Sequence, residues 1–242
     1  MEDRSGGKSR RGGLDKLDHR GQVWTSSTTE TKLVHRRRLP PLPHRCETVR
    51  VNPAPQPTLV LVEGASDRVA VETLARQRGL DLEDAGATIV ELGGATGIAN
   101  ALERRPAGVR LAGLVDAGEE RFFRHALEDI GLGTDLTRTG LEALGFFVCV
   151  TDLEDELIRA LGSEAVISVI EEQGNLRQFH TFQRQPAQRE RTVERQLHRF
   201  LGTTAGRKEQ YARALVERLD RAPRPLAQLV DFVATPADAS TL

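Results

Sequence analysis

Short apolar segments alternate with amphipathic segments between residues 58 and 162, and this alternation restricts the fold more than any other feature. The apolar segments are typical of buried strands and cover residues 58–62, 87–92, 109–116 and 145–150. The segments between them carry apolar residues at helical spacing, as Phe123 and Leu127 do. Strands and helices in turn predict an α/β fold with a mostly parallel sheet flanked by helices.

The chain on either side of this α/β segment has a different composition. Residues 1–57 are rich in Gly, Ser, Thr, Arg and Pro, so we expect a disordered, basic arm. Residues 163–242 show only helical patterns, and we expect them to form a helical part packed on the α/β domain of residues 58–162. The sequence therefore predicts an arm followed by two packed parts.

Charge is distributed unevenly along the chain. Residues 1–55 hold 12 Lys and Arg against 6 Asp and Glu, whereas the remaining residues hold 22 against 29. A basic arm on an acidic body occurs in nucleic-acid binders, but basic runs more often only keep a tail solvated. We favour the solvated tail, with nucleic-acid contact as the alternative.

The chain has two cysteines, Cys46 in the arm and Cys149 in an apolar strand. This placement indicates neither a disulfide framework nor a zinc cluster, and it fits a cytoplasmic protein. No apolar run approaches the roughly 18 residues that a membrane span needs, so we expect none.

Acidic residues follow three of the four predicted strands. They are Glu63 after the first strand, Asp116, Glu119 and Glu120 after the third, and Asp152 and Glu154 after the fourth. Ligands of an open parallel sheet bind beyond the carboxyl ends of its strands, so these side chains are expected at one edge. Carboxylates gathered there repel one another, and a hard cation such as Mg²⁺ would compensate the charge.

Helix capping is the alternative explanation for these acids. Asp and Glu often follow strands because they favour the start of the next helix, and Asp67, Asp116 and Asp152 could each do only this. Glu63 differs because it precedes both Gly64 and the expected cap. A turn at Gly64 can bring Glu63 and Asp67 toward one point, and acids at three strand ends favour the shared site.

The body of the chain contains a single lysine, Lys208, among 22 basic residues. Lysine is a compact point charge that could stabilise a phosphate beside a metal, although one lysine can also occur there by chance. Its neighbour Arg207 and the backbone amides of Gly93 and Gly94 are candidate substrate contacts. For the two glycines, an ordinary strand-to-helix turn is the alternative.

Four motifs follow one another along the chain: VEGASD at 62–67, LVDAGEE at 114–120, VTDLEDEL at 150–157 and GRKEQYARAL at 206–215. In order and spacing they resemble the motifs of a Toprim domain, most closely the version found in OLD (overcoming lysogenization defect) endonucleases. The resemblance covers about residues 58–235. It implies a Rossmann-like Toprim sheet and metal-dependent hydrolysis of phosphodiesters.

The resemblance also implies roles for individual residues. It makes Glu63, Asp67, Asp116 and Glu154 metal ligands, with Asp152 a weaker candidate. It makes Lys208 the residue that stabilises the transition state, with Glu63 also counted as catalytic. The implied cofactor is Mg²⁺ or Mn²⁺, and the implied partner is nucleic acid, most simply DNA.

Two departures from the family pattern bear on function. The second Asp of the family's Asp-x-Asp stretch is Gly118 here, and Glu119 or Glu120 is expected to replace it if either reaches the site. The chain also has no G-x-x-x-x-G-K-[ST] loop, so an ATPase would have to be a separately encoded partner.

Three functions remain in order of preference. The first is a Mg²⁺-dependent nuclease, and the second is a catalytically impaired module that binds nucleic acid or a partner ATPase. A small-molecule phosphohydrolase comes last. His125, His180 and His198 show no metal-ligand spacing and are expected at the surface or in packing.

Overall fold

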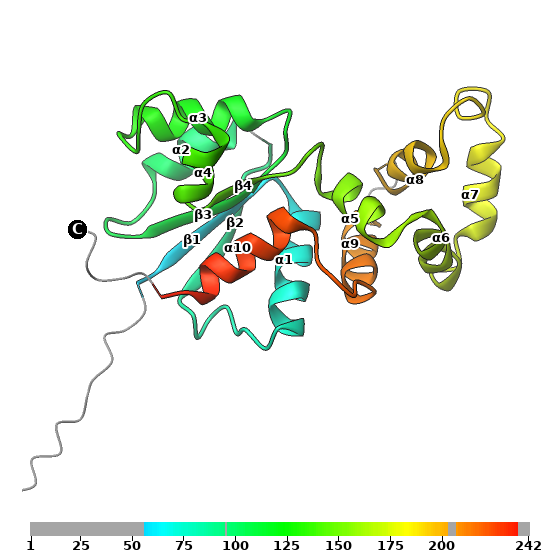
Figure 1. Ribbon diagram of the computed structural model, residues 1–242, viewed down its shortest axis with the longest axis horizontal. Coiled ribbons are helices and arrows are strands. Elements are labelled where there is room, and N and C mark those ends of the chain that lie inside the picture. The colour runs from blue at the N-terminus through cyan, green and yellow to red at the C-terminus, as the bar shows by residue number, and fades with distance from the viewer. Residues whose placement is uncertain (1–55, 95, 203–206, 237–242) are drawn as a thin grey trace, which may run out of the picture. The chain divides into compact units, whose positions relative to one another are not determined.

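The computed structural model describes residues 56–94, 96–202 and 207–236. The predicted N-terminal arm, except for its last two residues, and Cys46 lie outside these ranges. Four strands form one sheet: β1 (Thr58–Val62), β2 (Ala87–Glu91), β3 (Arg110–Val115) and β4 (Phe146–Val148). All pairs are parallel and the strand order is β2-β1-β3-β4, which confirms the predicted α/β class (Figure 1).

Helices cover both faces of this sheet because each strand alternates its side chains between two apolar layers. The helices of the α/β segment are α1 (Ala65–Gln77), α2 (Gly97–Glu103), α3 (Glu120–Asp129), α4 (Arg138–Ala143) and α5 (Leu153–Leu161). Leu61, Val115 and Phe146 pack with α2, α3 and α4, whereas Val60 and Val62 pack with α1 on the opposite face. This alternation is the period-two pattern expected of strands buried on both sides.

Among the described residues, the elements that follow α5 are all helices. They are α6 (Ser163–Glu172), α7 (Leu176–Gln183), α8 (Val193–Gly202), α9 (Lys208–Glu217) and α10 (Arg224–Ala234). Their buried side chains, including Phe179 and Phe200, belong to the same apolar cluster as Val60 and Val62 of the sheet. The helical region and the sheet therefore share a hydrophobic core.

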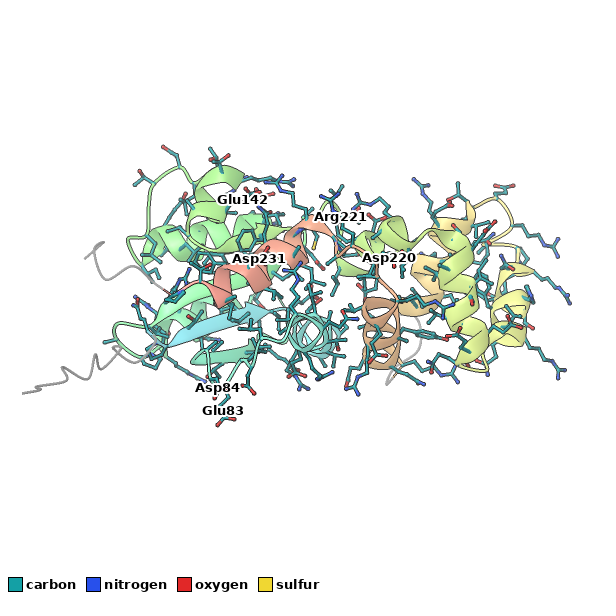
Figure 2. The ribbon with its side chains drawn as sticks, turned by 60° about the horizontal axis from the view of Figure 1, so that its bottom comes forward. Glu83, Asp84, Glu142, Asp220, Arg221 and Asp231 are labelled. Carbon is teal, nitrogen blue, oxygen red and sulfur yellow. The ribbon has the colours of Figure 1, made fainter. Side chains whose placement is uncertain are left out.

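The last helix, α10, returns to the sheet after the other helices. It packs against β3, β4 and α1. Arg224 of α10 pairs with Glu142 of α4 at 3.0 Å, and Asp231 of α10 pairs with Arg78, the residue after α1, at 2.6 Å. Figure 2 labels Glu142 and Asp231, one acid from each pair. Leu226, Leu229 and Val230 of α10 are buried in the core, and this apolar packing holds α10 over one face of the sheet more than the exposed ion pairs do.

The fourth strand is shorter than the predicted 145–150. Gly145 has a φ of +90°, which a strand does not use, and Val150 is 62 % exposed. The chain therefore leaves the sheet soon after Val148 and places Asp152 at the start of α5. In the described part of the chain, no helix combines the length and the apolarity needed to cross a lipid bilayer.

Candidate functional site

A cleft of about 850 Å³ lies at the carboxyl edge of the sheet. Its walls come from the ends of β1 and β3, from the starts of α1, α5 and α9, and from the end of α8. Charged groups dominate its lining, which includes Glu63, Asp67, Asp116, Asp152, Glu154 and Lys208. The parallel sheet thus brings together acids that are up to 91 positions apart in the sequence.

The turn between β1 and α1 places two of these acids. Glu63 follows the last residue of β1, Gly64 caps α1, and Asp67 lies in the first helical turn. The amide of Gly64 donates a hydrogen bond to Oδ2 of Asp67 at 3.0 Å. This bond closes the turn around Gly64, and both Glu63 and Asp67 line the cleft.

Burial changes the charge state of Asp67. Its side chain is 9 % exposed, and burial raises its pKa from 3.8 to about 7. The negative charges of Glu154 and Glu63 add to the increase, while the Gly64 amide and the Lys208 ammonium oppose it. Asp67 is therefore mostly protonated below about pH 7 and loses its proton around neutral pH.

Asp116 follows the last residue of β3 and behaves in the same way. Burial is the main reason that its pKa is raised, followed by the charge of Asp67 and a hydrogen bond with Glu63. Asp152 contributes further repulsion. The cleft thus gathers more negative charge than it can hold unaided, which is the condition in which a cation binds by displacing protons.

The start of α5 supplies two further acids, Asp152 and Glu154, and Glu209 of α9 also lines the cleft. Asp152 caps this helix by accepting a hydrogen bond from the Asp155 amide at 2.8 Å, and its Oδ2 lies 2.6 Å from Nε2 of His198 on α8. Burial alone would raise the pKa of Asp152, but the bonds to His198 and to the Asp155 amide outweigh burial and lower it. Capping and cleft lining are therefore compatible roles for one residue.

Lys208 is the first residue of α9, and its Nζ lies 3.4 Å from Oε1 of Glu154. Burial would lower the pKa of this lysine, but Glu154, Asp67 and Glu63 outweigh burial and raise it. Lys208 is therefore a permanent cation in the cleft at neutral pH.

Comparisons with known proteins find one similar family and several solved structures with a similar fold. Residues 57–104 match the model of the family described as "Overcoming lysogenization defect protein-like, TOPRIM domain". This range includes Glu63, Gly64 and Asp67. This segment is therefore similar to the Toprim domain of OLD-like proteins.

Solved structures show the same Toprim fold. The C-terminal region of the Burkholderia pseudomallei OLD protein has a TM-score of 0.55 at 18 % identity, over 73 % of this chain and 96 % of that one. The C-terminal region of the Xanthomonas campestris pv. campestris OLD protein, phased with platinum, has a TM-score of 0.56 at 23 % identity, over 74 % and 94 %. No curated protein matches the sequence.

The Toprim fold does not bring every candidate residue into the cleft. Glu120 is 8 % exposed and pairs with Arg124 and with Arg138, whose Nε lies 2.8 Å away. Glu119, which precedes α3, also lies outside the cleft lining. The expectation that one of them replaces the acid missing at Gly118 is therefore not met, because α3 begins there and carries both residues away.

Two candidate substrate contacts also need correction. The amide of Gly93 donates to the carbonyl oxygen of Glu63 at 3.0 Å, so it extends the strand pairing and cannot bind a phosphate. Gly94 lines the cleft beside it. Arg207 does not line the cleft, because its guanidinium donates to Oε1 of Gln178 on α7 at 2.6 Å.

The structure gives His198 a contact that the sequence does not predict. His198 was expected at the surface or in packing, yet it hydrogen-bonds Asp152 at the edge of the Toprim cleft. The hydrogen bond that Asp152 accepts from His198 raises the pKa of His198, and this effect outweighs burial, which lowers it. The contact depends on how α8 packs against α5, for which the sequence carries no local signal.

The carboxylates are suitable metal ligands by their chemistry, but they are not yet arranged around a common point. Within residues 56–94, 96–202 and 207–236, no three Asp, Glu, His or Cys side chains are already arranged to hold an ion. The cleft nevertheless offers only oxygen donors, two of them with raised pKa values, and these fit hard cations such as Mg²⁺ or Mn²⁺.

Proposed function

We propose that this protein is a Mg²⁺-dependent nuclease that hydrolyses phosphodiester bonds of DNA. The convergence of acids from three strand ends with Lys208 in one cleft is the observation that supports this function. The Toprim resemblance agrees with it, since Toprim domains of the OLD type are nuclease-related and generally depend on divalent metals. DNA as substrate and Mg²⁺ as cofactor are part of the proposal.

Four carboxylates would hold the cation. Glu63, Asp67, Asp116 and Glu154 line the cleft together, and Asp152 could add a further oxygen. When bound, divalent ions neutralise the charge of a phosphodiester and make a bound water a better nucleophile. The loss of protons from Asp67 and Asp116 on binding would leave these two side chains as anionic ligands.

Lys208 would act on the substrate as a cation. Its raised pKa leaves no population of neutral amine at neutral pH, so it does not serve as a general base. The ammonium group lies 3.4 Å from Glu154 and faces the same cleft as the other acids. From there it would donate to a phosphate oxygen and stabilise the charge that develops in the transition state.

A second function rests on Gly118. The family's second acid is missing there, and neither Glu119 nor Glu120 lines the cleft. A Toprim module with an incomplete ligand set would bind nucleic acid, or a separately encoded ATPase, without cutting. An added side chain has room at Gly118, because a Cβ there meets no atom within 4 Å.

Cleavage assays separate the two functions. Purified protein would be incubated with plasmid and single-stranded DNA and with Mg²⁺ or Mn²⁺, and wild type would be compared with Glu63→Ala and Lys208→Ala. Glu103→Ala and Arg213→Ala are matched controls, since both residues are exposed and lie outside the cleft. A nuclease predicts loss of cleavage in the first two variants only, whereas equal cleavage in all five proteins would indicate a contaminant.

A further inference from the structure

Basic side chains gather on α7 and α8, and the end of α8 lines the cleft. Residues 176–202, which span α7, α8 and the turn between them, contain six arginines and two glutamates. The rest of residues 56–242 holds 16 Lys and Arg against 27 Asp and Glu. The arginines are Arg177, Arg184, Arg189, Arg191, Arg195 and Arg199, and we call them the α7–α8 arginines.

These arginines differ from others in the protein in what they contact. Seven arginines elsewhere form ion pairs with Asp or Glu. Among the described residues, no carboxylate pairs with any of the α7–α8 arginines. Five of the six are exposed, and Arg191 is half-buried. One of the two glutamates, Glu194, accepts a hydrogen bond from Ser163 at 2.7 Å instead.

Two of the arginines form a line that leads into the cleft. Arg195, Arg199 and Gly202 are spaced four and three residues apart on α8, so they share one face of the helix. Gly202 lines the cleft. With a rise of about 1.5 Å per residue, Arg199 lies roughly 4.5 Å before Gly202 along the helix axis and Arg195 roughly 10 Å before it.

This spacing suits a nucleic-acid backbone. A strand of duplex DNA presents a phosphate about every 3.4 Å along its axis, so two guanidinium groups about 6 Å apart can meet nearby phosphates. Arginine binds phosphate through paired donors and keeps its charge at any working pH. An extended polyanion that contacts Arg195 and Arg199 would continue toward the acids and Lys208.

The aromatic residues of this region favour a duplex over a single strand. Proteins that bind single strands stack bases on exposed aromatic rings. Phe179 and Phe200 are instead buried with ring centroids 5.1 Å apart, and Phe182 packs on Phe200 at 5.6 Å. These rings form the core of the α7–α8 region, in which no described Phe is exposed, whereas five of the six arginines are.

We infer that the α7–α8 arginines bind the phosphate backbone of duplex DNA and guide it to the cleft. This inference deepens the proposed function and rests on it for the choice of DNA as the polyanion. The contacts reach phosphates rather than base edges, so binding is independent of sequence and strongly dependent on salt. Loss of these contacts weakens binding without altering the carboxylates of the cleft.

Binding without cleavage tests this surface. Fluorescence anisotropy of a labelled duplex would be measured in EDTA with the full chain, across a range of salt concentrations. For Arg195→Gln/Arg199→Gln we expect Kd to rise about tenfold and the slope of log K against log salt to fall by about 2. The control Arg104→Gln/Arg121→Gln removes the same charge at two exposed residues outside α7 and α8, and its Kd should stay within twofold.

Several results would overturn the inference. Equal Kd values for the two double variants would exclude the arginine line, and tighter binding of a single strand or of duplex RNA would exclude duplex DNA as the occupant. An equal loss of binding to polyglutamate would indicate an acidic protein partner. If circular dichroism shows that the α8 variant is unfolded, Arg177→Gln/Arg184→Gln supplies the same comparison. Because no cleavage is needed, an inactive nuclease with normal arginine dependence would leave this inference standing.

Discussion

The cleft and the α7–α8 helices carry opposite charge and acquire it in opposite ways. The cleft collects acids from separate strand ends and buries them, so that the pKa values of Asp67 and Asp116 rise. The α7–α8 arginines come from one continuous segment and stay largely exposed, without carboxylate partners among the described residues. Under the two proposals, the buried acids would bind a cation and the exposed arginines would bind a polyanion. Binding and chemistry should therefore be separable by mutation.

The largest effect should come from the cleft. Glu63→Gln, Asp116→Asn and Lys208→Gln keep side-chain size but remove charge, and each should lower kcat for DNA cleavage by about a hundredfold or more, as removal of a group that stabilises the transition state does. Steady-state kinetics on a plasmid substrate would measure this loss. An unchanged kcat in Lys208→Gln would remove the lysine from the chemistry.

The next largest effect should come from the α7–α8 arginines, and it should appear in KM rather than in kcat. Arg195→Gln/Arg199→Gln should raise KM about tenfold at moderate salt and leave kcat nearly unchanged, since uniform binding is lost. The same assay with Arg104→Gln/Arg121→Gln provides the reference. A fall in kcat without a change in KM would mean that the two regions cannot be separated.

The charge state of the cleft predicts a pH dependence of stability. The folded pKa of Asp67 lies near 7, above its ordinary value of 3.8, so its contribution is fully present below about pH 4 and is lost as pH rises toward 7. In EDTA, the free energy of unfolding should fall with rising pH across this window, by roughly 1 kcal/mol per pH unit for each such group. Urea titrations would measure it.

Substitution of the buried acid provides the control for this pH dependence. Asp67→Asn should make the profile between pH 4 and 7 less steep, because the amide does not titrate while Asp116 still does. Saturating Mg²⁺ should reverse the slope, since the ion binds the deprotonated carboxylates. A metal-free profile that rises with pH in this window would contradict the charge state that burial gives Asp67.

A smaller effect is expected at Gly118, where the family pattern has a second Asp. Gly118→Asp places a carboxylate where a Cβ meets no atom within 4 Å, so it should fold and tighten Mn²⁺ binding severalfold. Gly118→Asn is the neutral control of equal size. Equal affinity in both variants would show that position 118 does not face the metal.

The smallest effect should come from the link between the two regions. His198 on α8 bonds Asp152 at the cleft, and a partly exposed ion pair contributes about 0.2–1 kcal/mol. The pKa of His198 is raised and that of Asp152 lowered, so this contribution is present when both are charged and is lost as pH rises through the His198 pKa. A double-mutant cycle with His198→Gln and Asp152→Asn at pH 5.5 and pH 9 would measure it.

The sequence predicts the cleft better than the helices around it. Parallel strands must end at a common edge, so Glu63, Asp116 and Asp152 could be placed together from the strand pattern alone. Glu120 could not be excluded, because its partner Arg138 is 18 positions away and only the packing of α4 reveals it. The role of His198 could not be predicted for the same reason, because its partner Asp152 is 46 positions away.

The amide of Gly93 illustrates a further limit of sequence reasoning. A Gly-Gly pair after a strand is compatible with a phosphate contact, but whether an amide is free depends on register. In the structure β1 and β2 stay paired one step beyond the predicted strand end, so Gly93 donates to Glu63. Turn composition predicts where the chain bends and not which donors the bend leaves available.

Calorimetric titration of metal-free protein with Mn²⁺ tests the shared site most directly. Glu63→Gln, Asp116→Asn and Glu154→Gln change residues that follow three different strands, and Glu103→Gln is the control outside the cleft. We expect each of the first three to weaken the same binding event by about tenfold or more, since each would remove a ligand charge, and the control to match wild type. Binding that is unchanged in all three variants would contradict a common metal site at the sheet edge.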